Sequence, residues 1–121
     1  MKALVVEDEE GMATVLKSWL EKLGLEVMVT NTLESAARII ATPPVPEVIT
    51  LDLNLLDSPV QDTISRVKEI RKLTPEALLL IVSGVMTDHD KIRLTTMGAD
   101  ATIEKIEIGT EKSFLSKLSD V

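Results

Sequence analysis

Five side chains suited to metal or phosphate chemistry follow short apolar runs of the chain. Glu7 and Asp8 follow the first run, Asp52 follows another, Ser83 a further one, and Lys105 comes after the last. Mg²⁺ prefers oxygen ligands and commonly bridges carboxylates to phosphate oxygens. A carboxylate beside such an ion, with a lysine and a hydroxyl group nearby, can act as a nucleophile towards an activated phosphoryl group. The pattern predicts phosphoryl chemistry if these residues meet in the fold.

Each of these residues also has an ordinary structural explanation. Acids such as Glu7 and Asp8 ahead of a helix interact favourably with the helix dipole. Asp52 could cap a turn, Ser83 could be a turn residue, and a single lysine such as Lys105 is usually solvated. No residue is specific by itself. Their joint placement at consecutive strand ends favours a functional site.

The elements that must position these residues alternate along the chain. Apolar runs predict strands, and periodic apolar stripes predict helices between them. The first helical stripe contains Met12, Val15, Leu16, Trp19, Leu20 and Leu23, with Gly24 as its stop. Thr32 and Thr110 are predicted to cap helices, and Gly98 to end one. The predicted strands are residues 3–6, 27–29, 48–51, 78–82 and 101–103, and the helices 12–23, 33–40, 62–73, 88–97 and 111–118.

Five such strand–helix units predict an α/β fold, a parallel sheet sandwiched between two helical layers. In such sheets ligands bind beside the carboxyl ends of the strands, where the winding reverses. If the first and third strands are neighbours, Glu7, Asp8 and Asp52 converge in one crevice. Their mutual repulsion would raise the pKa of at least one of them, and a divalent cation would relieve it.

Composition limits the classes of function. With 121 residues, of which 45% are hydrophobic, the chain is expected to form one domain spanning 1–121. Thirteen basic against twenty acidic residues give a net charge of −7, which disfavours binding to nucleic acid or to an anionic membrane. The absence of cysteine excludes disulfides and thiol catalysis. We expect a cytoplasmic protein without a signal peptide or membrane span.

Four segments together resemble the receiver domain of two-component response regulators. They are Leu4-Val5-Val6-Glu7-Asp8-Glu9, Ile49-Thr50-Leu51-Asp52-Leu53-Asn54-Leu55, Leu80-Ile81-Val82-Ser83-Gly84 and Gly98-Ala99-Asp100-Ala101-Thr102-Ile103-Glu104-Lys105. The resemblance covers nearly the whole chain. It implies a flavodoxin-like (βα)5 sandwich with strand order 2-1-3-4-5.

The resemblance also implies a role for each candidate residue. Asp52 would accept a phosphoryl group from the phosphohistidine of a histidine kinase or phosphotransfer protein. Ser83 would donate a hydrogen bond to a phosphoryl oxygen, and Lys105 would pair with Asp52 and then with the phosphoryl charge. Mg²⁺ would be held by Glu7, Asp8, Asp52 and the backbone carbonyl of Asn54. The chemistry would be self-phosphorylation and autodephosphorylation, not turnover of a metabolite.

Three positions depart from the family pattern. Thr102 stands where the family usually has an aromatic residue, Ile106 replaces the proline after the lysine, and Leu56 replaces the proline after the phosphoacceptor segment. Without an aromatic at 102, the family's rotamer readout is expected to be absent or altered. These departures are compatible with phosphorylation of Asp52. They put in doubt the family's usual way of passing the phosphorylation signal to the rest of the domain.

Three functional hypotheses follow. The first is a phosphorylatable receiver that switches a protein-binding surface at about residues 88–120. The second is a receiver-like binding module that works without phosphorylation. The third, a phosphatase or transferase, would need a substrate pocket that 121 residues hardly provide. His89, the only histidine, is expected to face solvent, and Trp19 to pack in the core. Whether the chain is complete or part of a longer protein stays open.

Overall fold

Five strands form one parallel sheet in the order β2-β1-β3-β4-β5, which confirms the predicted order. The computed structural model describes residues 1–119. The two carboxyl-terminal residues, which end the expected domain and the expected surface at 88–120, lie outside the described part. The strands are β1 (Lys2–Val6), β2 (Glu26–Thr30), β3 (Val48–Leu51), β4 (Leu78–Ser83) and β5 (Ala101–Glu104).

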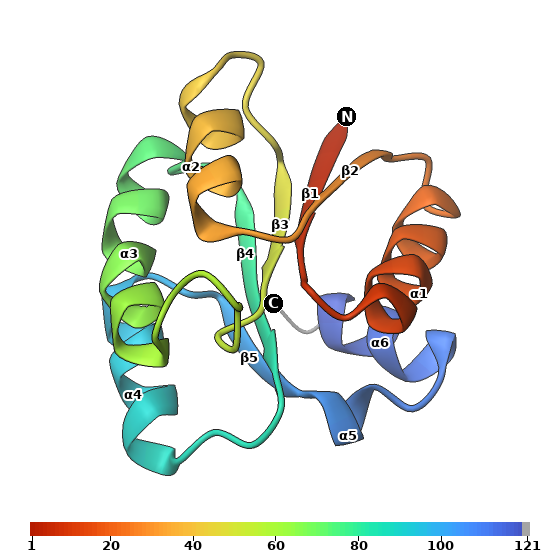
Figure 1. The fold of residues 1–121 in the computed structure, drawn as a ribbon. Coiled ribbons are helices and arrows are strands. Elements are labelled where there is room, and N and C mark those ends of the chain that lie inside the picture. The colour runs from red at the N-terminus through yellow and green to blue at the C-terminus, as the bar shows by residue number, and fades with distance from the viewer. Residues whose placement is uncertain (120–121) are drawn as a thin grey trace.

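Helices cover both faces of the sheet, giving the three layers that the sequence predicts. On one face lie α2 (Leu33–Ala41), α3 (Val60–Leu73) and α4 (Asp88–Met97). On the other lie α1 (Glu10–Glu21), the short α5 (Lys105–Ile108) and α6 (Glu111–Ser119). Figure 1 shows the sheet between the two sets of helices.

The central strands are apolar on both sides because each contributes to two cores. In β1, Leu4 and Val6 join the core under α2, α3 and α4, whereas Ala3 and Val5 join the core under α1 and α6. This alternation follows from the two-residue period of a strand. It explains why the run reads as continuously hydrophobic, as expected for a parallel strand buried between helices.

The predicted helix ends are largely confirmed. The Thr32 hydroxyl accepts a hydrogen bond from the N–H of Ser35 at 3.1 Å, and Thr110 accepts one from Ser113 at 3.1 Å. Gly98 ends α4 with a φ of 119°, a left-handed conformation that favours glycine.

Trp19 and Phe114 pack with their ring centroids 5.4 Å apart, so Trp19 contributes to the contact between α1 and α6.

Two details of the sequence prediction were wrong. The first helix ends at Glu21, and Val15 and Leu23 of the predicted stripe are 38% and 52% exposed. The buried positions of α1 are Ala13, Leu16 and Leu20, a narrower face than the stripe suggested. A separate short helix, α5, also precedes α6, because Glu104 and Glu107 form a reciprocal capping box that starts a helix directly after β5.

The turn between α4 and β5 is fixed by an arginine that binds several backbone carbonyls. Arg71 donates to the carbonyls of Gly98 at 2.8 Å and Ala77 at 2.7 Å, and its Nη2 lies 2.6 Å from Asp100. A Cβ atom at position 98 would lie 2.6 Å from Cγ of Arg71. Glycine is therefore required at this position both by its φ and by the space available.

We predict that Gly98→Ala lowers the free energy of unfolding by about 2 kcal/mol, because it combines strained backbone with a steric clash. Urea denaturation checks this. Gly11→Ala is the matched control, because a Cβ at Gly11 meets no atom within 4 Å and the position lies in α1. It should stabilise the protein by roughly 0.5–1 kcal/mol. Equal effects of the two substitutions would contradict the assignment.

Candidate functional site

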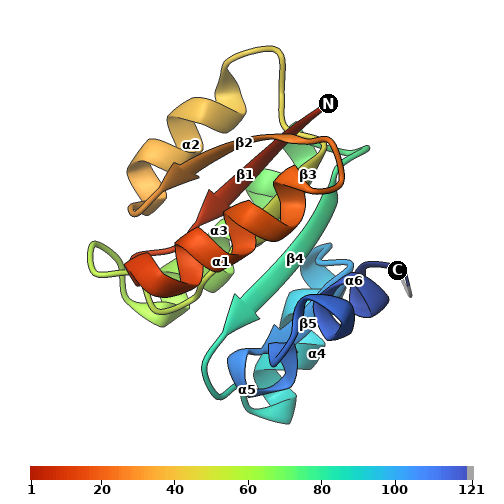
Figure 2. The ribbon, with the colours of Figure 1, turned by 90° about the vertical axis from the view of Figure 1, so that its right-hand side faces the viewer.

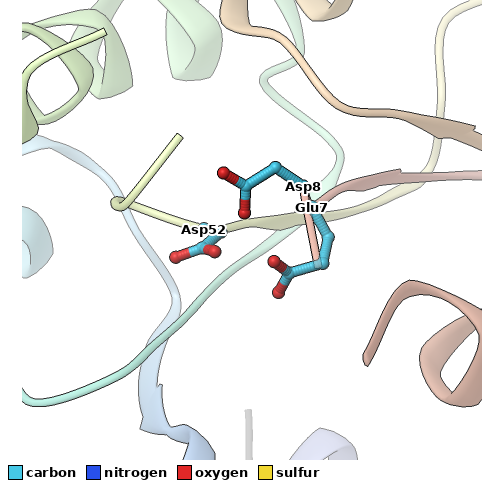
Figure 3. A group of neighbouring side chains, drawn as sticks. All are labelled: Glu7, Asp8 and Asp52. Carbon is cyan, nitrogen blue, oxygen red and sulfur yellow. The ribbon is translucent and has the colours of Figure 1, made fainter. Parts of the chain in front are cut away.

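The candidate residues meet at the carboxyl ends of the strands. Glu7 and Asp8 follow β1, Asp52 follows β3, Ser83 ends β4 and Lys105 begins α5 directly after β5. One carboxylate oxygen from each of the three acids lies within 4.8 Å of those of the other two. Figure 3 shows the three carboxyl groups gathered at this edge. Residues far apart in the sequence thus form one acidic cluster.

Backbone hydrogen bonds extend the sheet by one residue and hold the acids in place. The N–H of Glu7 donates to the carbonyl of Thr30, the last residue of β2, at 2.9 Å. The N–H of Asp52 donates to the carbonyl of Val6 at 3.0 Å. The main chain of both acids is therefore fixed by the neighbouring strand, so their side chains leave the sheet from rigid positions.

Asp52 is the most thoroughly contacted member of the cluster. It is only 2% exposed. Its Oδ1 accepts hydrogen bonds from the N–H of Asn54 at 3.0 Å and from the hydroxyl of Ser83 at 3.1 Å. Its Oδ2 accepts one from Nζ of Lys105 at 3.2 Å. Each oxygen of this carboxylate is oriented by at least one donor.

Lys105 is shared among several acids. Besides Asp52, its Nζ lies 3.0 Å from Oε1 of Glu7 and 3.4 Å from Oε2 of Glu9. Position 105 follows β5 on the other side of β4 from Asp52, so the long lysine side chain reaches back over the end of the sheet. One ammonium group thereby offsets part of the negative charge of the buried acids.

Burial and charge shift the ionisation of the cluster in opposite directions. Burial, with a hydrogen bond shared with Asp52, raises the pKa of Glu7 to about 7. Burial also acts to raise the pKa of Asp52, but its contacts with Glu7, Asn54 and Lys105 outweigh burial and hold that pKa below its usual value. Burial acts to lower the pKa of Lys105, and its contacts with Glu7 and Asp52 raise it above the ordinary value instead. Because Glu7 keeps its proton up to about pH 7, the acidic cluster carries less negative charge than its number of carboxyl groups suggests.

The cluster fits a divalent cation. Although Oε1 of Glu7 lies 3.0 Å from Lys105, it is buried and accepts no well-aligned hydrogen bond from residues 1–119. A buried carboxylate oxygen without such a bond is energetically costly. Three carboxylates within reach of one another form the oxygen-rich donor set that Mg²⁺ or Ca²⁺ prefers. Residues at this edge could therefore hold such an ion.

One polar contact of the site was not predicted from the sequence. The side-chain amide of Asn54 donates to the Ser83 hydroxyl at 2.9 Å, whereas the prediction for Asn54 concerned only its backbone carbonyl. A polar residue between Leu53 and Leu55, two positions after Asp52, was the available signal. His89 lies exposed in the first turn of α4, as expected.

The chain is similar in amino-acid sequence to part of several longer proteins. It is 35% identical over 115 residues to a protein-glutamate methylesterase/protein-glutamine glutaminase of Halobacterium salinarum, an alignment that covers 93% of this chain and 29% of that protein. The chain spans between 28% and 43% of the length of the curated relatives it matches. The similarity therefore concerns one part of these longer proteins.

Solved structures and a family model agree with this similarity. The receiver domain of HemR from Leptospira biflexa is 27% identical, with a TM-score of 0.81, covering 98% of this chain and 91% of that one. A response regulator from Burkholderia pseudomallei is 24% identical, with a TM-score of 0.81, covering 98% of this chain and 71% of that one. Residues 3–112 match the family described as the response regulator receiver domain. Given this match and the acidic cluster at the end of its parallel sheet, the chain belongs to the receiver domain family of response regulators.

Proposed function

We propose that residues 1–121 form a receiver domain in which Asp52 accepts a phosphoryl group and thereby switches a protein-binding surface. The observation that carries this proposal is the environment of Asp52. Its carboxylate is buried, faces Lys105 and Ser83, and lies within the acidic cluster of Glu7 and Asp8. A nucleophile, a cation and a hydroxyl donor are thus already assembled.

The proposed reaction transfers a phosphoryl group from a phosphohistidine to Asp52. A carboxylate oxygen of Asp52 forms a bond to phosphorus while the phosphorus–nitrogen bond breaks, and the departing imidazole takes up a proton. Negative charge on the phosphoryl oxygens is stabilised by the Lys105 ammonium and by a hydrogen bond from the Ser83 hydroxyl. Water later hydrolyses the acyl phosphate and restores the carboxylate. The domain cycles between two states instead of turning over a metabolite.

The amide of Asn54 has a positioning part in this proposal. Because it donates to the oxygen of Ser83, it leaves the Ser83 proton free to point towards Asp52. The Ser83 hydroxyl is thus oriented before the phosphoryl group arrives. Preorganised donors of this kind need little rearrangement during the reaction.

Mg²⁺ is the proposed cofactor. Glu7, Asp8, Asp52 and the backbone carbonyl of Asn54 would hold the ion, whose charge would offset that of the carboxylates and of the incoming phosphoryl group. The buried Oε1 of Glu7, which accepts no well-aligned hydrogen bond from residues 1–119, supports this assignment. The response regulator from Burkholderia pseudomallei, a neighbour in fold, carries a phosphorylated aspartic acid and a calcium ion.

The proposed partners are a histidine kinase or phosphotransfer protein and a downstream protein. Receiver domains of this family interact with histidine kinases. The downstream surface is proposed to be α4, β5, α5 and α6, about residues 88–120, of which the structure describes all but the last. An ion pair of 2.7 Å between Lys91 and Glu104 joins α4 to β5 there, and Ile92 is 66% exposed. In residues 1–119 no helix is long and apolar enough to cross a membrane.

The first test of this function is the mass of the intact protein after incubation with acetyl phosphate and Mg²⁺. We expect wild type to gain the mass of one phosphoryl group and Asp52→Asn to gain none, because the amide is not a nucleophile of comparable strength. Asp57→Asn is the matched control. Asp57 is an exposed acid in the same loop and accepts hydrogen bonds from the N-terminal N–H groups of α2, outside the cluster.

Asp57→Asn should be phosphorylated as wild type is. No mass gain by wild type would contradict the proposal and favour a receiver-like module that binds partners without phosphorylation. A mass gain retained by Asp52→Asn would instead show that the phosphoacceptor has been misassigned.

The second test is the pH dependence of Mg²⁺ binding. Glu7 must lose its proton to bind the ion, and its pKa is raised to about 7. Mg²⁺ affinity measured by calorimetry should therefore rise as pH increases through about 7 and level off above it. The rise should approach tenfold per pH unit below that pKa.

The same shift has a consequence for the metal-free protein. Because the folded state retains the Glu7 proton between the unfolded pKa of 4.5 and about 7, the free energy of unfolding should fall as pH rises through that interval. Glu7→Gln should weaken Mg²⁺ binding, and it should remove the pH dependence of both the Mg²⁺ affinity and the free energy of unfolding. Glu10→Gln, an exposed acid of α1, should leave both unchanged. A pH-independent affinity for wild type would show that Glu7 does not bind the ion.

A further inference from the structure

The two edges of the sheet differ in how they are protected. Unpaired strand edges bind other strands unless charges, proline or bulges interfere. Strand β5 ends in Glu104 and is flanked by Asp100 and Lys105. The β2 edge reads Glu26-Val27-Met28-Val29-Thr30 and has one charge, at its beginning. Met28 and Val29 are 45% and 43% exposed, so β2 is an apolar edge that is open to pairing.

The backbone of β2 has donors and acceptors that point away from the sheet. The N–H of Glu26 donates to the carbonyl of Met1, and the carbonyl of Thr30 accepts from Glu7, so both residues face β1. Because neighbouring residues of a strand point their N–H and C=O groups in opposite directions, Val27 and Val29 face outward. Both valines can therefore exchange hydrogen bonds with an added strand.

Hollows lie on both sides of this edge. On the α1 side, Val27 and Val29 line a hollow of about 410 Å³ together with Ala13 and Thr14. On the α2 side, Met28 lines a second hollow of about 370 Å³ with Ile39. Figure 2 shows β2 between α1 and α2. An added strand would place successive side chains alternately into the two hollows.

We propose that β2 pairs in antiparallel orientation with β2 of a second copy of this chain, about a two-fold axis at Met28. In this register Val27 lies opposite Val29 of the partner, and Val29 opposite Val27. The N–H and C=O groups of both valines point outward, so the two residues of each pair exchange both of their backbone hydrogen bonds. The two Met28 side chains meet on the α2 side. The two sheets then continue through the interface as one.

Charge complementarity favours a second copy over an unrelated extended peptide. Glu10 and Lys17 of α1 both border the hollow beside Val27 and Val29. α1 starts at the end of the sheet where β2 ends, so Glu10 lies towards Val29 and Lys17 towards Val27. A two-fold axis at Met28 places Glu10 of each copy near Lys17 of the other. Lys17 is available for this, because its contact with Glu21 is 4.0 Å long and exposed.

The proposed interface leaves the other surfaces of the domain free. It uses the β2 edge, whereas the surface at residues 88–120 lies around β5, at the opposite edge of the sheet. The acidic cluster lies at the carboxyl ends of the strands. Self-association and phosphorylation can therefore be measured independently, and failure of one proposal leaves the other standing.

The first experiment uses a single cysteine, because the natural chain has none. In the proposed register the Cα atoms at position 28 are about 4.5 Å apart, within the range that a disulfide spans. Met28→Cys should form a covalent dimer under mild oxidation at least tenfold faster than Val15→Cys. Val15 is similarly exposed, at 38%, and does not line the hollow beside β2. Equal rates of dimer formation would overturn the proposed register and interface.

The second experiment exchanges the two charges and follows dimerisation by analytical ultracentrifugation over a concentration series. Lys17→Glu and Glu10→Lys should each weaken the dimer about fivefold or more, because the two-fold axis makes each pair occur twice. The double variant should restore the wild-type dissociation constant to within about threefold. Circular dichroism of each variant checks that α1 remains folded.

Wild type that stays monomeric at the highest concentration would overturn the proposal, as would a double variant that is weaker than either single one. Monomeric wild type that binds an extended apolar peptide through β2 would also reject the second copy as the occupant.

A third experiment puts a charge on the exposed edge. Val29→Lys should abolish dimerisation, whereas Leu73→Lys, at a similarly exposed position in α3, should not.

Discussion

The burial of several carboxyl groups beside one another is the constraint on which the rest of this structure depends. Glu7 and Asp52 are each 2% exposed and sit within the same cluster as Asp8. Such groups are tolerated only when cations, hydrogen bonds or bound protons compensate them. Here Lys105 supplies the cation, and the raised pKa of Glu7 shows that compensation is incomplete. A divalent cation bound among these carboxylates would supply the positive charge that Lys105 alone does not.

The parallel sheet makes this arrangement possible, since all its strands end at the same edge. Strand ends from four different units bring the acids, Ser83 and Lys105 together. Backbone hydrogen bonds to a neighbouring strand fix Glu7 and Asp52. The helices determine little of this chemistry directly. They bury both faces of the sheet and so keep the strand ends rigid, as Arg71 does for the turn before β5.

Much of the fold and the meeting of the candidate residues could be predicted from the sequence. The runs before Glu7, Asp52 and Ser83 are apolar because the strands are buried on both faces, and this is a local signal. Contacts between side chains of different elements are not local. The hydrogen bond from Asn54 to Ser83 and the exposure of Val15 depend on how neighbouring elements pack. The roles of the site residues remain predictions.

One hydrogen bond joins the framework to the chemistry, because the carbonyl that ends β2 receives the amide of Glu7. The length of β2 therefore helps to determine where Glu7 lies. Removing one residue from β2 would shift its alternation, turn Met28 towards the opposite helical layer and leave Glu7 without its anchor. Substitutions in β2 could therefore leave this anchor intact, whereas a deletion would remove it.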